Sequence, residues 1–118
     1  MAKNGWIGVD LDGTLAHYDG WKGIEHIGAP IPKMVERIKR WRAEGKRVKI
    51  FTARACDRAA IPYVQKYCFD IFGEAFDVTN VKDYGMVELW DDRAQGIIIN
   101  TGEIKHPEDQ TEPLDITF

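Results

Sequence analysis

The stretch that decides the fold is residues 6–15, which read WIGVDLDGTL. Its first half places apolar residues among small neighbours, a pattern typical of a buried β-strand, and its second half places two carboxylates on either side of a leucine. A strand that ends in Asp-x-Asp-Gly brings acidic side chains to the carboxyl edge of a sheet, where open α/β sheets bind their ligands. We therefore expect the chemistry of this protein at the end of its first strand.

The two carboxylates belong to Asp10 and Asp12, and they are followed by Gly13, which permits a turn with positive φ. Carboxylates this close repel each other and hold a proton between them unless a cation neutralises them. Mg²⁺ suits such a site, because it prefers one or two carboxylates together with phosphate and water oxygens. An ordinary acidic turn is the alternative. An EF-hand calcium loop is excluded, because Leu15 and Trp21 stand where that loop needs Gly and Glu.

Length and composition indicate one domain over residues 1–118, with an irregular tail over about 103–118. The net charge of -3 offers no broad basic field to attract nucleic acid or an anionic membrane. Residues 1–5 lead directly into the first strand, without an apolar segment for a signal peptide or a membrane span. Cys56 and Cys68 form no CxxC motif. We therefore expect a cytoplasmic protein with no membrane partner.

Helical and extended patterns alternate along the remaining chain. Apolar residues at helical spacing predict a helix that opens at residues 30–32 and ends at Gly45, and a second helix over about 58–71. Apolar and β-branched runs predict further strands over 47–51, 76–80, 86–90 and 96–100. This alternation indicates an α/β fold in which helices pack on the faces of a parallel sheet.

The loop over residues 16–29 is rich in glycine and aromatic residues. It is too polar and too rich in glycine for a regular element. Two interpretations are open: a flap beside the site, or a surface connection in which Trp21 packs on the core.

Polar side chains recur where the predicted strands end: Asp10 and Asp12, then Thr52 and Arg54, then Lys82, then Asp91 and Asp92. Because these ends lie along one edge of a parallel sheet, we expect them to form one cluster. Carboxylates, a hydroxyl and two cations suit a phosphoryl group and a divalent metal. In such a cluster Asp10 would be the nucleophile that forms an aspartyl-phosphate, and Asp12 would be the general acid and base.

These residues resemble, in chain order, the four motifs of the haloacid dehalogenase superfamily. The matching segments are residues 10–14 (DLDGT), Thr52, Lys82 and the pair Asp91-Asp92, and the resemblance runs from residue 6 to about residue 101. It implies a Mg²⁺-dependent phosphohydrolase with a three-layer, Rossmann-like core and the strand order 5-4-1-2-3.

The resemblance also implies roles for single residues. Mg²⁺ would be bound by the carboxylate of Asp10, the backbone carbonyl of Asp12 and an acid of the fourth motif, which we assign to Asp91 with Asp92 as a close second. Thr52 and Lys82 would hold the phosphoryl oxygens, and Lys82 would restrain Asp10. Taken singly, Thr52 could instead cap the segment that follows it, and Lys82 could be an exposed loop lysine.

Two more residues are candidates for the substrate-binding set. Gly13 lies beside the acidic pair, and Arg54 follows Thr52 closely. Arg54 either contacts the substrate or forms a surface ion pair with a neighbouring acid.

The intervals between the motifs are too short for the cap domain that members of this superfamily usually carry. An uncapped site favours bulky phosphorylated substrates such as nucleic-acid ends or proteins, or a homo-oligomer whose second subunit closes it over a small metabolite. A non-catalytic protein that binds a phosphoryl ligand and a phosphotransferase remain open alternatives. A metal-independent dehalogenase is disfavoured by the acidic fourth motif. A response-regulator receiver is disfavoured because its phosphorylated aspartate follows the third strand.

Overall fold

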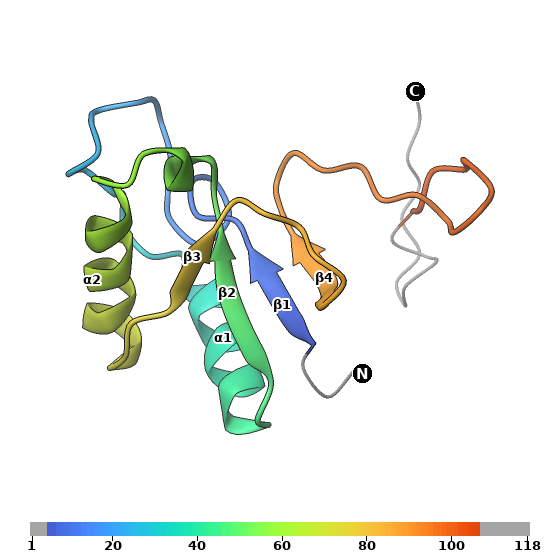
Figure 1. Ribbon diagram of the computed structural model, residues 1–118, viewed down its shortest axis with the longest axis horizontal. Helices are drawn as coiled ribbons and strands as arrows, with labels where there is room; N and C mark the ends of the chain where they lie inside the picture. Colours follow the sequence, from blue (N-terminus) through green and yellow to red (C-terminus); the bar gives the residue numbers. More distant parts are fainter. Residues whose placement is uncertain (1–4, 107–118) are drawn as a thin grey trace.

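The computed structural model describes residues 5–106, which form a small α/β domain with a four-stranded parallel sheet and two α-helices (Figure 1). In chain order the elements are β1 (Trp6–Val9), α1 (Pro32–Ala43), β2 (Arg47–Phe51), the short 3-10 helix η1 (Ala53–Cys56), α2 (Ile61–Phe72), β3 (Asp77–Thr79) and β4 (Met86–Trp90). The strands lie in the order β3-β2-β1-β4, and each pair of neighbours is parallel.

Proline and glycine set the ends of the helices. Pro32 opens α1, since proline at the first helical position costs no backbone hydrogen bond. α2 begins at Ile61 rather than near the predicted residue 58, because Pro62 is accommodated only in a first turn. Gly73 ends α2 in the left-handed conformation, with φ 82°, and its N–H donates to the carbonyl oxygen of Phe69 at 2.8 Å. The two predicted helices are therefore confirmed.

Both helices cover the same face of the sheet. Ile7 of β1 lies in register with Val48 of β2. These two side chains share one buried cluster with Ile38 of α1 and with Val64 and Cys68 of α2. The alternation of the strands therefore places the whole core on one side of the sheet.

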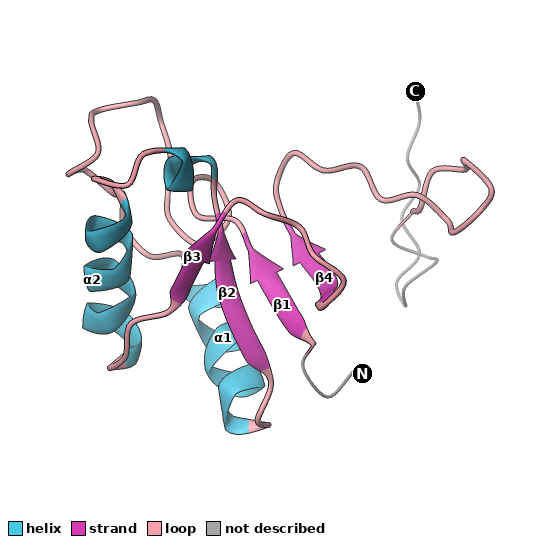
Figure 2. Cartoon of the chain, in the orientation of Figure 1, coloured by secondary structure: helices cyan, strands magenta, loops and turns pink. Residues whose placement is uncertain are grey.

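The opposite face carries no helix in the part of the chain that the structure describes. The chain passes from β3 to β4 through residues 80–85, which form a loop. Trp6 on this face is only 1% exposed, because the Lys49 ammonium lies 4.5 Å from its ring centroid and its indole N–H donates to Asp83 at 2.9 Å. The predicted three-layer arrangement is therefore wrong for residues 5–106, which form two layers (Figure 2).

The fifth strand expected over residues 96–100 does not join the sheet. Only residues 91–95 separate this run from β4, whereas a parallel neighbour needs a crossover of about a dozen residues. Ile97 instead forms an isolated antiparallel bridge with Ile104, and Ile97 and Ile99 are 50% and 81% exposed. Figure 1 shows this segment, in orange, running away from the sheet. The observed order therefore differs from 5-4-1-2-3, although the four strands present have the expected neighbours.

The predicted tail falls partly outside the described residues. Its first residues include Ile104, which makes the bridge to Ile97, and residues 107–118 lie beyond the described range. Among residues 5–106, neither helix has both the length and the apolar character that crossing a membrane requires.

Candidate active site

Three carboxylates converge at the carboxyl edge of the sheet. β1 and β4 are neighbours in parallel register, and the backbone N–H of Asp10 donates to the carbonyl oxygen of Trp90 at 2.9 Å. The residues that follow the two strands therefore lie side by side. One carboxylate oxygen each from Asp10, Asp91 and Asp92 lies within 4.8 Å of the other two. The prediction that the first and fourth strands bring their acids together is confirmed.

The pKa values of Asp10 and Asp92 shift in opposite directions. Burial, a hydrogen bond with Asp92 and the charges of Asp91 and Asp92 raise the pKa of Asp10 to about 7. Although burial acts to raise the pKa of Asp92, hydrogen bonds from Asp10 and Thr14 hold it below its usual value. When no cation is bound, Asp10 therefore takes up a proton more readily than Asp92 does. The sequence predicted this repulsion between Asp10 and Asp12, whereas the structure places it between Asp10 and the acids that follow β4.

Thr14 and Gly13 hold Asp92 against the end of the first strand. The Thr14 hydroxyl lies 3.0 Å from Oδ1 of Asp92 and 3.5 Å from Oδ2 of Asp10, and it accepts the backbone N–H of Asp92 at 3.1 Å. Gly13 has φ 92°, and a Cβ there would lie 2.7 Å from Oδ2 of Asp92. Gly13 is therefore required both by its backbone conformation and by the close approach of Asp92.

The contact of Thr14 with Asp92 was not predicted from the sequence. The available signal was a hydroxyl residue four positions after Asp10, but its partner is 78 positions away along the chain. For Gly13, the predicted contact with substrate stays a prediction.

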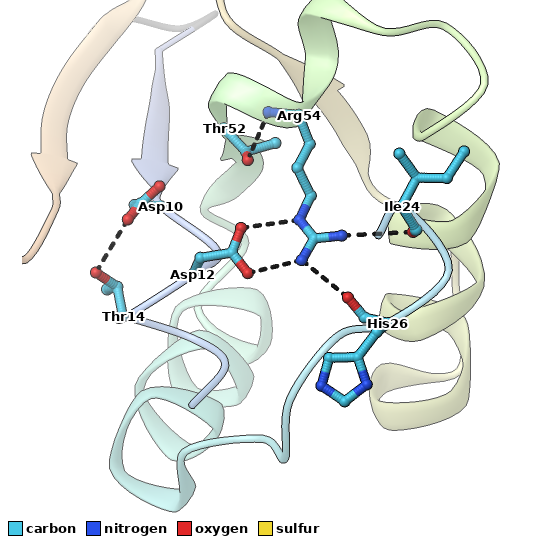
Figure 3. A network of polar contacts seen from close by, with 7 residues as sticks. All are labelled: Asp10, Asp12, Thr14, Ile24, His26, Thr52 and Arg54. Atoms are coloured by element: carbon cyan, nitrogen blue, oxygen red, sulfur yellow. Dashed lines mark hydrogen bonds and ion pairs between the residues drawn. The ribbon is translucent and has the colours of Figure 1, made fainter. Parts of the chain in front are cut away.

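Asp12 is held by Arg54 in a buried ion pair (Figure 3). The guanidinium donates from Nε to Oδ2 at 2.8 Å and from Nη2 to Oδ1 at 2.9 Å, and the Arg54 side chain is only 5% exposed. Such a bidentate pair fixes the orientation of the carboxylate. The surface ion pair considered for Arg54 is thus a buried one, and its partner is the predicted general acid and base.

The same guanidinium attaches the loop over residues 16–29 to the site. Arg54 donates to the carbonyl oxygens of His26 at 2.9 Å and Ile24 at 3.4 Å (Figure 3). Its Cζ lies 4.8 Å from the ring centroid of Trp21. Trp21 is 57% exposed, so the interpretation in which it packs on the core is wrong. The loop lies beside the site, as the flap interpretation predicted.

Thr52 is buried at the start of η1. Its hydroxyl oxygen accepts the backbone N–H of Arg54 at 3.1 Å, and its own N–H donates to the carbonyl oxygen of Thr79 at 2.9 Å. The capping role considered for Thr52 is thus confirmed. Thr52 also lines the cavity at this edge of the sheet. Its role in binding a phosphoryl group stays a prediction.

A cavity of about 760 Å³ opens beside these residues. It is lined by the predicted residues Asp10, Asp12, Thr52, Arg54 and Asp91, by Tyr18, Trp21 and Ile24 of the loop, and by Phe51, Ala53, Cys56, Asp57, Ala60, Asn80 and Arg93. The structure therefore brings residues from four strand ends to one hollow. Arg93 and Asn80 were not predicted, although each follows a strand end closely.

Three predicted site residues do not line this hollow: Asp92 and Gly13, which lie beside Asp10 in the acidic cluster and its turn, and Lys82. Lys82 is the one of the three that has no contact with the cluster in the part of the chain that the structure describes. It is exposed in the loop between β3 and β4, and it is absent from the cavity lining. Within residues 5–106 it makes no hydrogen bond or ion pair. Its neighbour Asn80, two positions earlier, does line the cavity. The restraint of Asp10 by Lys82 is therefore not found in this structure.

The acidic cluster fits a hard divalent cation. Asp10, Asp91 and Asp92 offer carboxylate oxygens, which are the ligands that Mg²⁺ prefers, and the charges of Asp91 and Asp92 contribute, after burial, to the raised pKa of Asp10. The carboxylate of Asp12 lies outside this cluster because Arg54 binds both of its oxygens. A contribution of Asp12 through its backbone carbonyl stays a prediction.

Comparison of the chain with protein-family models, with curated proteins and with solved structures found no match. The resemblance to the haloacid dehalogenase superfamily therefore rests on the motif residues of the sequence alone.

Proposed function

We propose that this protein is a Mg²⁺-dependent phosphomonoester hydrolase of the haloacid dehalogenase type, with Asp10 as its nucleophile. The single observation that carries the proposal is the convergence of Asp10, Asp91 and Asp92, two of which, Asp10 and Asp91, line a cavity together with Asp12 and Thr52. Carboxylates in this number serve a metal and a nucleophile together, and the hydroxyl and the backbone groups near η1 offer donors to phosphoryl oxygens.

The reaction would take two steps at phosphorus. In the first, a carboxylate oxygen of Asp10 forms a bond to phosphorus while the bond to the leaving oxygen breaks, and Asp12 gives that oxygen a proton. In the second, water attacks the phosphorus of the aspartyl-phosphate, Asp12 takes the proton of the water, and Asp10 leaves as a carboxylate. Mg²⁺ held by Asp10, Asp91 and Asp92 would offset the negative charge of the phosphoryl group.

The ion pair with Arg54 bears on both steps. Arg54 donates to both oxygens of Asp12, which fixes the orientation of the carboxylate that accepts a proton in the second step. The first step needs a protonated Asp12, so one of the two hydrogen bonds has to break when substrate binds. This observation favours a second candidate, a protein that binds a phosphoryl ligand without hydrolysing it.

Hydrolysis of p-nitrophenyl phosphate tests the proposal. We expect release of p-nitrophenol that depends on Mg²⁺ and stops with EDTA, and a loss of at least about 100-fold in kcat for Asp10→Asn. Asp70→Asn is the matched control, because the same change then falls on an exposed residue of α2 that pairs with Lys66. Equal release by wild type and Asp10→Asn would remove the catalytic proposal.

A binding measurement separates the two candidates. If no ester is hydrolysed but inorganic phosphate raises the melting temperature of the wild type in the presence of Mg²⁺, the non-catalytic candidate replaces the hydrolase. A product that carries the phosphoryl group on an added alcohol instead of free phosphate would identify a phosphotransferase.

A further inference from the structure

We infer that the cavity takes a phosphomonoester whose alcohol carries a planar ring system, as in a nucleoside 5′-monophosphate, and that Trp21 stacks on that ring. The inference rests on the proposed function, because it assigns the phosphoryl group to the acidic cluster and the ring to the loop side of the same cavity.

The loop side of the cavity is aromatic and open. Trp21, Tyr18 and Ile24 line it, and Trp21 is 57% exposed although tryptophan is highly buried on average. Tyr18 is 39% exposed. Two accessible aromatic side chains on one wall of a cavity suit stacking with a planar ligand group.

Trp21 is held in place by Arg54, the residue that also binds the predicted general acid. The Arg54 guanidinium lies 4.8 Å from its ring centroid and makes two hydrogen bonds to Asp12. The carbonyl oxygens of Ile24 and His26, which follow Trp21 in the loop, accept hydrogen bonds from the same guanidinium. These bonds attach the loop to Arg54. One buried cation therefore sets the position of the ring relative to the predicted general acid. A ring so fixed loses little conformational freedom when a ligand stacks on it.

The size and charge of the cavity favour a small molecule. Its volume of about 760 Å³ lies within the range of sites for small ligands, about 300–1,000 Å³. Asn80, Asp57 and Arg93 on its wall add donors and acceptors for the polar edge of a heterocycle or for a sugar. The protein carries a net charge of -3, which gives a long polyanion no broad attraction.

The test compares two substrates that differ only in the planar base. Adenosine 5′-monophosphate and ribose 5-phosphate carry the same phosphorylated carbon, so a difference in KM between them measures contacts to the base. We expect the wild type to show a KM at least about tenfold lower for adenosine 5′-monophosphate, since stacking of a base on an aromatic side chain contributes about 1–3 kcal/mol. We expect Trp21→Ala to remove this preference between the two substrates, and Trp21→Phe to restore most of it.

Tyr63→Ala is the matched control, because Tyr63 is exposed on α2 to the same 39% as Tyr18 but lies outside the cavity lining. Equal KM values for the two substrates in the wild type would overturn the inference. It would also be overturned if Trp21→Ala raised both KM values alike, since the ring would then only support the loop.

A binding titration keeps this inference separate from the proposed function. Asp10→Asn protein is titrated with each compound in the presence of Mg²⁺, and heat or tryptophan fluorescence is measured. If p-nitrophenyl phosphate and both sugar phosphates stay intact with the wild type, the hydrolase proposal fails. The titration then still decides the inference: tighter binding of the nucleotide that depends on Trp21 supports it, and equal binding of both compounds overturns it.

Discussion

Replacing Asp10 by asparagine should stabilise the protein at high pH when no divalent cation is present. The amide has nearly the shape of the carboxyl group but cannot ionise, so it removes the repulsion from Asp91 and Asp92. The pKa of Asp10 is raised to about 7 from 3.8, by burial first and then by its hydrogen bond with Asp92 and the neighbouring charges. The folded protein therefore holds the proton more tightly than the unfolded chain does.

The sign and the size of the effect follow from this difference. Between about pH 4 and pH 7 the folded state binds more protons than the unfolded state, so the free energy of unfolding of the cation-free wild type falls as pH rises, and it stays low above pH 7. The full difference in pKa corresponds to about 4 kcal/mol. Because Asp10 is partly exposed and solvent screens its neighbours, we expect about 2 kcal/mol, or about 8 °C in melting temperature for a domain of this size.

The assay is thermal or urea unfolding of wild type and Asp10→Asn at pH 5 and pH 8. Each measurement is made once with EDTA and once with Mg²⁺ at about 5 to 10 mM. At pH 8 in EDTA the variant should be the more stable protein, and at pH 5 its advantage should be less than about half as large. Mg²⁺ should stabilise the wild type at pH 8 and the variant much less. A variant that is less stable than wild type at pH 8 in EDTA would refute the reasoning, as would the same difference at both pH values.

Three further changes test other contacts of the site. Thr14→Val should lower the apparent affinity for Mg²⁺ about tenfold, because Asp92 loses its hydroxyl partner, and Thr14→Ser should retain the affinity. A titration with Mg²⁺ in which the melting temperature is followed measures this affinity. Arg54→Ala should lower the free energy of unfolding measured in urea by about 3 kcal/mol, since it leaves Asp12 without its buried partner. Replacing the exposed Arg47 by alanine should lower it by less than about 1 kcal/mol, and similar costs for the two changes would count against the buried pair. Lys82→Ala should leave both stability and the KM for p-nitrophenyl phosphate unchanged, because the side chain is exposed and lies outside the cavity; a KM raised about tenfold or more would place Lys82 in the site after all.

Local patterns were sufficient for the regular elements. Proline at the start and glycine at the end of each helix, together with apolar residues on one face, predicted α1 and α2 to within a few residues. Four of the five predicted strands are present, because runs of apolar and β-branched residues are likewise a local pattern. The fifth is absent from the sheet because the apolar run over residues 96–100 predicts a strand without regard to the length of the connection that has to carry it there.

By itself, the sequence determined that acids end the first and fourth strands, because alternation and strand length depend on nearest neighbours along the chain. Only the tertiary structure decided which groups meet: Asp10 lies against Asp91 and Asp92, Asp12 binds Arg54, and Lys82 stays outside the cavity. These pairings depend on distances of a few ångströms between segments that are tens of residues apart, and such distances are set by the register of β1 with β2 and β4 and by the turn at Gly13.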